Sequence, residues 1–357
     1  KNISELDLQF DKKINCFIGD NGVGKTNLLD AIYYLSFCKS YFNPIDSQNI
    51  RHEQDFLVIQ GKYLKQETEE DIYCGIKRNH KKQFKKNKKE YQRLSDHIGL
   101  LPLIIITPVD TVLITGGSDE RRKFIDTVIS QYNKEYLDNL IKYNKALQQR
   151  NMLLKDFAKN NYYSRETLEP WDEQLIQRGN FIFRNRNDFI EEFQPVFQKY
   201  YEYISAGREP VELIYDSHLH ENEFRDLLQK AAEKDRILQY TSVGTHKDDL
   251  YLKLSGHPIK KTGSQGQQKT YLVSLKLAQF EIMKEIYGFK PVLLLDDVFD
   301  KLDKERVEQI IKLVAEHYFG QIFITDTSKK RLEDILTGIG IEFSLFTMDN
   351  GNVTKRI

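Results

Sequence analysis

One octapeptide near the amino terminus limits the possible folds of this chain more than any other feature. Residues 19–26 read Gly-Asp-Asn-Gly-Val-Gly-Lys-Thr and match the pattern G-x-x-x-x-G-K-[ST] in full. An apolar run precedes this loop at 14–18, and apolar residues at helical spacing follow it over 28–35. Glycines let backbone N–H groups turn onto phosphate oxygens, and the positive end of the next helix faces the same anion. The strand–loop–helix order therefore predicts an α/β P-loop fold that binds a nucleoside triphosphate, which we expect to be ATP.

The loop supplies most of the predicted contacts with the nucleotide. We expect Lys25 to reach the β- and γ-phosphate oxygens and the Thr26 hydroxyl to ligate Mg²⁺. The full set of predicted ATP-binding residues is Gly19, Asp20, Asn21, Gly22, Val23, Gly24, Lys25, Thr26 and Asn27.

A second segment supplies carboxylates for the same site. The apolar run 292–295, typical of a buried parallel strand, ends in Asp296 and Asp297. We expect Asp296 to hold the Mg²⁺ and Asp297 to polarise the attacking water. The predicted catalytic residues are thus Lys25, Asp296 and Asp297.

A Ser-x-Gly-Gln turn lies upstream of the carboxylate strand, at Ser264, Gln265, Gly266 and Gln267. By itself such a turn is best explained as a helix cap. The order of P-loop, this turn, the Asp pair, and then Asp300 and Asp303 is that of ABC-type ATPases. In that class the turn, called the signature, contacts the γ-phosphate held by a second subunit. Thr325 ends the next apolar run, where this class places a γ-phosphate sensor that is usually His.

The pattern along the chain predicts two lobes. Short β-rich runs extend from 56 to 106, and the segment 3–10 also favours a strand. An apolar stripe at steps of three or four over 124–147 predicts one long helix, and a second helical stretch covers 166–203 with an interruption near Pro195. We predict an ATPase lobe of mixed-sheet type from both chain ends, residues 1–114 and 289–357. A mostly helical lobe is inserted at 115–288 and carries the signature.

With these motifs in place, the chain resembles the RecF family of DNA replication and repair proteins. Several of the matching segments are peculiar to that family rather than shared by all P-loop proteins. One departure is Lys247, where the family usually has Arg after Gly-x-His, and lysine lacks the bidentate geometry of arginine. The matching segments, which span almost the whole chain, are residues 19–32, 107–110, 120–126, 143–154, 244–250, 265–268 and 293–303.

The resemblance implies a specific biology. RecF-like proteins have an ABC-type head without a long coiled coil, and they dimerise on ATP with two nucleotides between the subunits. They hydrolyse ATP slowly with stimulation by DNA, bind duplex and gapped DNA, and work with RecR and RecO to help load RecA. The implied protein is a cytoplasmic ATPase of DNA repair, replication and the SOS response.

The chain has 53 basic and 53 acidic residues, so only a local patch can direct it to DNA. Residues 77–89, called here the basic hairpin, contain eight Lys or Arg and no acid, with Asn87 at an expected turn. Such a segment tracks a phosphate backbone, although lysines also protect a solvated strand edge from aggregation. The predicted DNA contacts are Lys81, Lys82, Lys85, Lys86, Lys88 and Lys89.

Charged residues outside these motifs allow several explanations. Arg121 and Arg122 lie near a predicted helix N-terminus, where the dipole disfavours cations. A bound anion, a partner carboxylate or a surface salt bridge would each account for them. His246 has no second His or Cys nearby and is not expected to bind zinc, whereas Asp248 and Asp249 are candidates for a polar network near the signature turn.

Other classes of protein remain alternatives. One is the ATPase head of a chromosome-organising complex, which needs two long heptad arms in the insert. Another is a RecF-like defence ATPase, and a third is a transporter subunit, whose signature more often reads Leu-Ser-Gly-Gly-Gln. No apolar run is long enough to predict a membrane span, and three scattered cysteines fit a reducing compartment.

Overall fold

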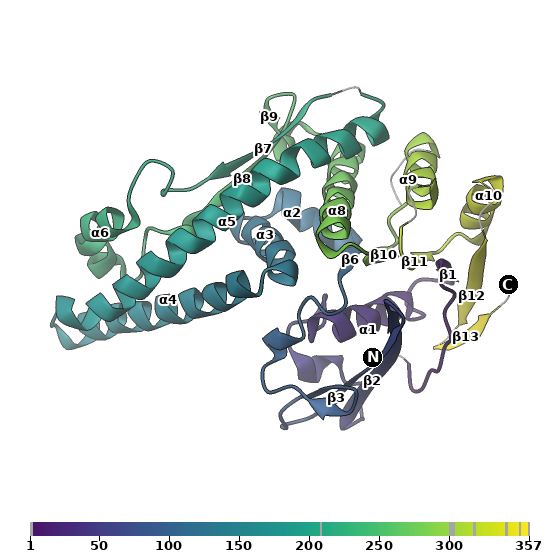
Figure 1. The fold of residues 1–357 in the computed structure, drawn as a ribbon, viewed down its shortest axis with the longest axis horizontal. Helices are drawn as coiled ribbons and strands as arrows, with labels where there is room; N and C mark the ends of the chain where they lie inside the picture. Colours follow the sequence, from purple (N-terminus) through teal and green to yellow (C-terminus); the bar gives the residue numbers. More distant parts are fainter. Residues whose placement is uncertain are drawn as a thin grey trace. The chain divides into compact units, whose positions relative to one another are not determined.

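The computed structural model divides the chain into two compact units, and each is described by itself (Figure 1). Unit 1 combines residues 1–110 with 275–357, and unit 2 comprises residues 111–274. The α/β architecture built from both chain ends agrees with the sequence prediction. The described residues are 3–207, 209–299, 304–316, 319–339, 342–349 and 351–355.

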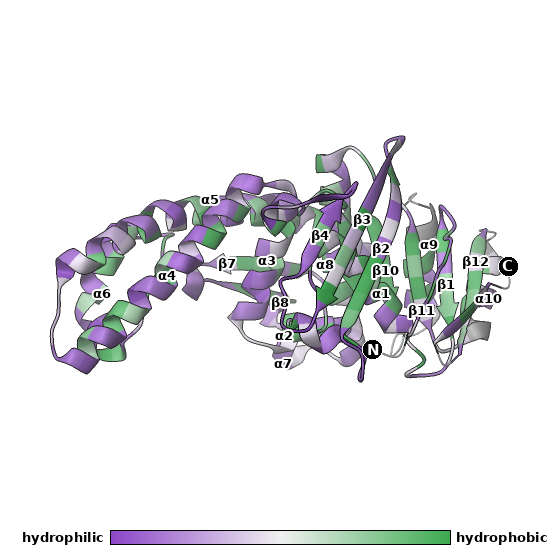
Figure 2. Ribbon diagram, turned by 90° about the horizontal axis from the view of Figure 1, so that it is seen from below, coloured by the Kyte–Doolittle hydropathy of each residue, from purple (hydrophilic) through white to green (hydrophobic). Residues whose placement is uncertain are grey.

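A six-stranded sheet organises unit 1, in the order β13-β12-β1-β11-β10-β6. Its strands pair in parallel except β13, which is antiparallel to β12. Strands β1, β6, β10 and β11 are mostly apolar and buried, as expected when both faces of a parallel sheet are covered, whereas the edge strand β13 is largely exposed (Figure 2). The strands are β1 (Ile14–Ile18), β6 (Leu103–Ile106), β10 (Val292–Asp296), β11 (Ile322–Asp326), β12 (Phe343–Asp349) and β13 (Asn352–Lys355).

Helices and the first residues of the chain cover this sheet. Phe17 stacks on Phe346 at 4.8 Å in the core, and Phe10 packs edge-on against Phe323 at 5.0 Å. Residues 3–13 contain no strand, so the strand predicted over 3–10 is wrong. Their apolar side chains pack on the core from an irregular backbone. The helices of this unit are α1 (Lys25–Phe37), α9 (Lys304–Glu316), α10 (Lys329–Ile339) and the 3₁₀ turns η1 (Asp46–Asn49), η2 (Leu94–Asp96) and η3 (Pro108–Thr111).

An antiparallel sheet, in the order β2-β3-β4-β5, forms the remainder of unit 1. Its buried face packs with α1 around Tyr34 and Phe84. Asn87 and Lys88 have φ of 49° and 67° and make the tight turn between β4 and β5, which confirms the predicted hairpin. The strands are β2 (Phe56–Lys65), β3 (Thr68–Lys77), β4 (Gln83–Lys86) and β5 (Lys89–Glu90).

Unit 2 is mostly helical, with a small sheet in the order β7-β8-β9. Its two longest helices, α4 and α5, lie side by side (Figure 1). Its elements are α2 (Val112–Thr115), α3 (Ser118–Tyr132), α4 (Lys134–Asn160), α5 (Arg165–Ser205), β7 (Val211–Asp216), α6 (Phe224–Leu238), η4 (Thr245–Lys247), β8 (Asp249–Leu254), β9 (His257–Pro258) and α7 (Ile259–Thr262), with α8 (Gln265–Tyr287) beginning here and ending in unit 1.

Two details of the predicted helices are wrong. The stripe over 124–147 spans two helices, because Asn133 ends α3 and its side-chain oxygen caps α4 by accepting from the Tyr136 N–H at 2.9 Å. Conversely, α5 continues through Pro195, which removes one N–H donor without ending the helix. The predicted lobe boundary at 288/289 follows the end of α8, whereas the compact units divide inside that helix at 274/275.

A buried histidine makes the stability of unit 1 depend on pH. His97 is fully buried, with Nε2 2.7 Å from the Leu35 carbonyl oxygen of α1 and Nδ1 3.0 Å from the Tyr91 hydroxyl. Burial lowers the pKa of His97 from 6.5 to about 4. The unfolded chain therefore binds this proton more tightly, and stability is lost as pH falls from 6.5 towards 4. The loss reaches about 3 kcal/mol at the acid end.

We expect His97→Gln to flatten this dependence, because glutamine can still donate to the Leu35 carbonyl but does not titrate. Urea unfolding at pH 7 and pH 5 measures the difference for each protein. Equal losses of stability in the parent and the variant would contradict the assignment to His97.

Candidate nucleotide-binding site

The loop at 19–26 adopts a conformation that requires its glycines. A Cβ on Gly19 would lie 2.3 Å from the Met348 carbonyl oxygen of β12, so no side chain fits there. Gly22 and Gly24 have φ of 84° and 113°, which side chains disfavour. Helix α1 begins directly after Gly24, with no side-chain cap and no acid in its first turn. Its first N–H groups and its positive dipole end therefore suit an anion.

Lys25 places a cation against this loop. Its side chain is buried, with 6% of the residue exposed. The ammonium donates to the carbonyl oxygens of Gly19 at 2.6 Å and Asp20 at 3.0 Å. The positive charge of Lys25 is thus held against the loop that precedes α1.

Sheet order brings the second motif to the same place. Strands β1, β11 and β10 are adjacent and parallel, so their carboxyl ends lie at one edge. There the Thr26 hydroxyl lies 3.1 Å from Oδ1 and 3.0 Å from Oδ2 of Asp296. A hydroxyl and a carboxylate are hard oxygen donors of the kind that Mg²⁺ takes beside phosphates. The structure therefore brings together the two side chains predicted to hold the metal.

Burial raises the pKa of the Asp296 carboxyl above its usual value, while hydrogen bonds from Thr325 and Thr26 oppose the shift. A nearby cation would favour the charged form. No cluster of three or more His, Cys, Asp or Glu able to hold a metal occurs among the described residues. Thr26 and Asp296 supply a hydroxyl and one carboxylate, and Mg²⁺ typically binds one or two such side chains together with substrate phosphates.

Thr325 lies beside both carboxylate residues at the end of β11. Its hydroxyl donates to Asp296 Oδ1 at 2.6 Å and accepts from the Asp297 N–H at 3.1 Å. Asp297 has φ of 52°, in the left-handed region. The sensor role predicted for Thr325 stays a prediction, as does the role of Asp297. The predicted residues Asp300 and Asp303 fall outside the part of the chain that the structure describes.

The signature turn forms a helix cap in unit 2. The Ser264 hydroxyl accepts from the Gln267 N–H at 3.3 Å, and the Gln267 side chain accepts from the Ser264 N–H at 2.7 Å. This reciprocal arrangement is a capping box at the start of α8. Ser264 and Gln265 are exposed, whereas Gly266 is half-buried. The cap explains the turn locally, and its contact with a second subunit's nucleotide stays a prediction.

The sequence did not predict a polar cluster that lies near α1. Asp110 closes the segment 107–110 by accepting from the Thr107 N–H at 2.7 Å, and it also accepts from the Tyr41 hydroxyl. Lys276 of α8 pairs with the same carboxylate at 3.1 Å. On α1, Asp30 accepts from the Tyr41 N–H at 2.8 Å. The only sequence signal for this cluster was the family-like segment 107–110.

The predicted DNA-binding lysines divide into two groups. Lys82 pairs with Asp46 at 2.8 Å and donates to the Cys38 carbonyl oxygen at the end of α1, at 2.6 Å. Lys86 pairs with Glu70 at 2.7 Å. These two side chains are engaged inside unit 1, so they are weaker candidates for DNA contact. The other four face solvent in whole or in part and are Lys81, Lys85, Lys88 and Lys89.

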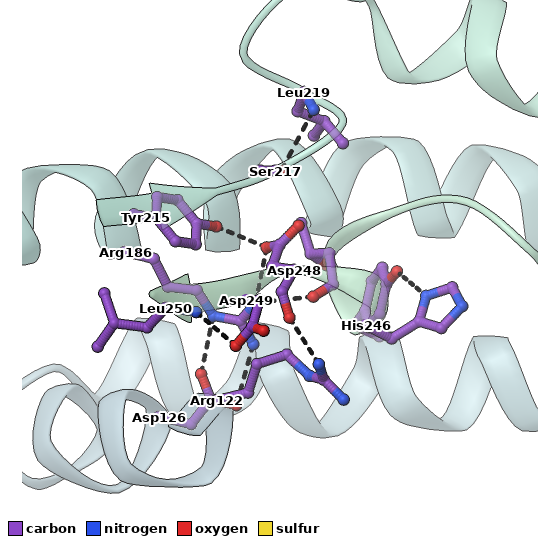
Figure 3. Close-up of polar contacts among 12 residues, drawn as sticks. Arg122, Asp126, Arg186, Tyr215, Ser217, Leu219, His246, Asp248, Asp249 and Leu250 are labelled. Carbon is purple, nitrogen blue, oxygen red and sulfur yellow. Dashed lines mark hydrogen bonds and ion pairs between the residues drawn. The ribbon is translucent and has the colours of Figure 1, made fainter. Parts of the chain in front are cut away.

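The charged residues near the start of α3 belong to a polar network in unit 2 (Figure 3). Arg121 pairs with Asp249 through two hydrogen bonds of 2.7 and 2.9 Å, and Arg122 donates to the Asp248 carbonyl oxygen at 2.6 Å. Of the three explanations considered for Arg121, the structure supports pairing with a carboxylate, that of Asp249. The structure confirms that Asp248 and Asp249 join a polar network. Its predicted place near the signature turn stays a prediction.

Arg186 of α5 is the centre of this network and was not anticipated. Its guanidinium is buried and bonds Asp126 at 2.9 Å and Asp248 at 2.8 Å, and Tyr215 donates to Asp248 at 2.5 Å. The nearby carboxylates and tyrosines hold the pKa of Arg186 well above its usual range against the effect of burial. Arg186 stands four residues after Ile182 and three before Phe189, on the buried apolar stripe of α5, and this spacing is the sequence signal that could have identified it.

His246 serves the same fold rather than a metal. Its ring nitrogens lie 2.8 Å from the Tyr143 hydroxyl and 3.0 Å from the Thr241 carbonyl oxygen. Burial lowers the pKa of His246 to about 4, so the ring is neutral at pH 7. Lys247 is exposed, with its ammonium 4.9 Å from the centre of the Tyr240 ring.

The fold and motifs define a class of protein. A parallel sheet whose adjacent strands lead into a P-loop and an Asp-Asp pair, with a helical insert that ends in Ser-x-Gly-Gln, is the ABC-type arrangement of P-loop ATPases. The model of the RecF/RecN/SMC N terminal domain matches residues 1–346. A structure of the Smc head domain from Pyrococcus furiosus shares this fold with a TM-score of 0.56 at 17% identity.

Full-length relatives narrow the class. The DNA replication and repair protein RecF of Phocaeicola vulgatus is 56% identical over 358 residues, covering 100% of this chain and 96% of that protein. RecF of Flavobacterium johnsoniae is 50% identical, covering 98% and 97%. A structure of the recombination mediator protein RecF with ATP, from the RecFOR pathway, has a TM-score of 0.90 at 31% identity over 100% of this chain and 95% of that one. This chain belongs to the RecF family of DNA replication and repair proteins.

The buried network gives a test of what holds unit 2 together. We expect Arg186→Met to lower the free energy of unfolding by about 3–5 kcal/mol, because Asp248 loses its charged partner while it stays buried. Arg225→Met is the matched control, since Arg225 pairs with Glu173 and about half of each side chain is exposed. Chemical denaturation measures both. Similar losses in the two variants would contradict the central role of Arg186.

Proposed function

We propose that this chain is an ATP-dependent DNA-binding protein of recombinational repair and replication. The observation that carries the proposal is the convergence of Lys25, Thr26 and Asp296 at one sheet edge beside an uncapped helix. Bound ATP in a solved relative that matches the whole chain supports it. The predicted nucleotide contacts at 19–27 belong to this site.

The site suits slow hydrolysis of ATP to ADP and phosphate, stimulated by DNA. Lys25 and the first N–H groups of α1 bind the β- and γ-phosphates, while Thr26 and Asp296 hold Mg²⁺. A Mg²⁺ held by Thr26 and Asp296 would neutralise charge that develops on the phosphate oxygens. Asp297 orients the attacking water and accepts its proton. We assign Asp297 this role because its backbone is fixed next to Asp296 by Thr325.

ATP acts chiefly as a dimerising ligand in this proposal. The exposed Ser264, with Gly266 and the start of α8, completes the nucleotide site of a second copy. We further propose that the chain binds gapped or junction DNA and works with RecR and RecO in loading RecA; membership of the RecF family and the RecFOR pathway named for the solved relatives support this proposal. By resemblance to the RecF family we place this activity in the cytoplasm. No described helix is long and apolar enough to cross a membrane.

A chromosome-organising head is the second candidate. It needs two long heptad arms between P-loop and signature, but unit 2 covers only residues 111–274, and its longest described helix, α5, has 41 residues. The Smc head likeness rests on the fold alone. The defence-ATPase alternative has no feature of the described residues in its favour.

Ser264→Asp tests the dimer. Aspartate retains the helix cap, whereas its charge repels the γ-phosphate of the partner's nucleotide. We expect each monomer to bind Mg-ATP as the parent does, while dimer affinity falls by about 100-fold or more. Nucleotide titration and light scattering measure the two effects. Ser264→Thr, which keeps the hydroxyl and the cap, is the control. A Ser264→Asp protein that dimerises on ATP like the parent would rule out this mechanism.

Charge reversal at Lys85, Lys88 and Lys89 tests the basic hairpin. If these side chains contact phosphates, affinity for duplex DNA falls by about tenfold or more, and the slope of log affinity against log salt falls by about 2–3. The control is the same reversal at the exposed lysines 145, 155 and 159 of α4, which changes net charge equally. Equal effects of the two triple variants would remove the hairpin as a specific surface.

A further inference from the structure

Thr325 lies on the strand of unit 1 that separates β1, which leads into the P-loop, from β10, which leads into Asp296 and Asp297. It is the next-to-last residue of that strand, β11, and its register partners are Phe17 and Asp296. The residue is fully buried. Any polar group here must find its partners within the sheet edge that carries the nucleotide motifs.

The hydroxyl of Thr325 has a single proton, and its direction is fixed by what surrounds it. The proton goes to Asp296 Oδ1 at 2.6 Å, while a lone pair accepts the Asp297 N–H at 3.1 Å. A proton bound to a buried carboxylate is not available to a phosphate oxygen. The geometry therefore disfavours a sensor that donates to the γ-phosphate.

The bond to Oδ1 also distinguishes the two oxygens of Asp296. The Thr26 hydroxyl is nearly equidistant from them, at 3.1 and 3.0 Å, and so does not select one. Thr325 contacts only Oδ1 and does so at a shorter distance. It thereby sets the rotation of the carboxylate about its side-chain bond.

The same side chain fixes Asp297. This residue has φ of 52°, a conformation that Asp tolerates but that costs about 1–2 kcal/mol. Such a backbone persists only where its surroundings hold it. The Asp297 N–H meets both the hydroxyl and the carbonyl oxygen of Thr325, at 3.1 and 3.2 Å.

We propose that Thr325 is a positioning residue that aligns Asp296 for the metal and Asp297 for the water, rather than a sensor of the γ-phosphate. The inference rests on the proposed ATP hydrolysis and names one more residue of that site. Thr325 acts through the two aspartates and touches no reacting atom.

Thr325→Val and Thr325→Ser form the test pair. Valine keeps the β-branched shape that suits a buried strand but lacks the hydroxyl, whereas serine keeps the hydroxyl. The full chain is used, and binding of Mn²⁺ is measured by electron paramagnetic resonance with a non-hydrolysable ATP analogue. We expect Thr325→Val to weaken Mn²⁺ binding and ATP turnover by about 10–100-fold. Serine restores both to within about threefold of the parent.

Nucleotide titrations without metal separate positioning from sensing. The proposal expects the preference of Thr325→Val for ATP over ADP to match that of the parent. A lost preference with unchanged Mn²⁺ affinity would overturn it in favour of a sensor. Valine and serine variants that behave alike would exclude the hydroxyl. If Thr325→Val is not obtained folded, Thr325→Ala takes its place.

ATP binding and hydrolysis by the parent protein distinguish a failure of this inference from a failure of the proposed function. A parent that binds and hydrolyses ATP, with an equally active Thr325→Val, overturns the positioning role alone. A parent that neither binds nor hydrolyses ATP overturns the proposed function and the inference together.

Discussion

The contact between the Thr26 hydroxyl and the Asp296 carboxylate joins two parts of the chain that are 270 residues apart. It depends on strand order, because β11 must lie between β1 and β10 for the ends of the two motif strands to meet. The buried, nearly all-apolar strands make that order costly to change. Everything proposed about the nucleotide follows from this edge of the sheet, where the loop, the helix end and the carboxylates converge.

Two buried arginines connect the helices of unit 2 beside an apolar core that includes Phe193 and Phe197 of α5. Arg186 and Arg150 are both buried, and each holds carboxylates contributed by separate helices or loops. Removing one partner of such a group is costly, whereas the intact group adds little net stability. Its contribution is to specify which helices meet. The network around Arg186 also holds the segment 244–250 through Thr245 and Asp248, and the exposed Lys247 lies between these two residues.

The sequence was sufficient for the α/β architecture, and it predicted that Thr26 and Asp296, from two distant motifs, would meet. The P-loop pattern and the apolar run before Asp296 each have a strict spacing, so their strands and the α1 helix were predicted where they occur. Local pattern failed where one side chain decided the outcome, as at Asn133, which breaks an otherwise continuous stripe. It also failed at Pro195, where packing along α5 outweighs one lost hydrogen bond.

Partners that depend on tertiary contacts were out of reach of the sequence. Nothing in the spacing of Arg186 or Thr325 shows that each lies between two acidic residues. Counting the lysines of residues 77–89 likewise overstated the charge that faces solvent, because Lys82 and Lys86 pair with acids elsewhere in the unit.

The position of Lys82 has a mechanical consequence. Helix α1 has 13 residues and is thus about 20 Å long, with the phosphate loop at one end and, at the other, the Lys82 ammonium bonded to the carbonyl oxygen of the C-cap residue Cys38. The basic hairpin and the phosphate loop therefore contact opposite ends of helix α1. A movement of the basic hairpin away from α1 would therefore either break the bonds of Lys82 or tilt the helix that follows the phosphate loop.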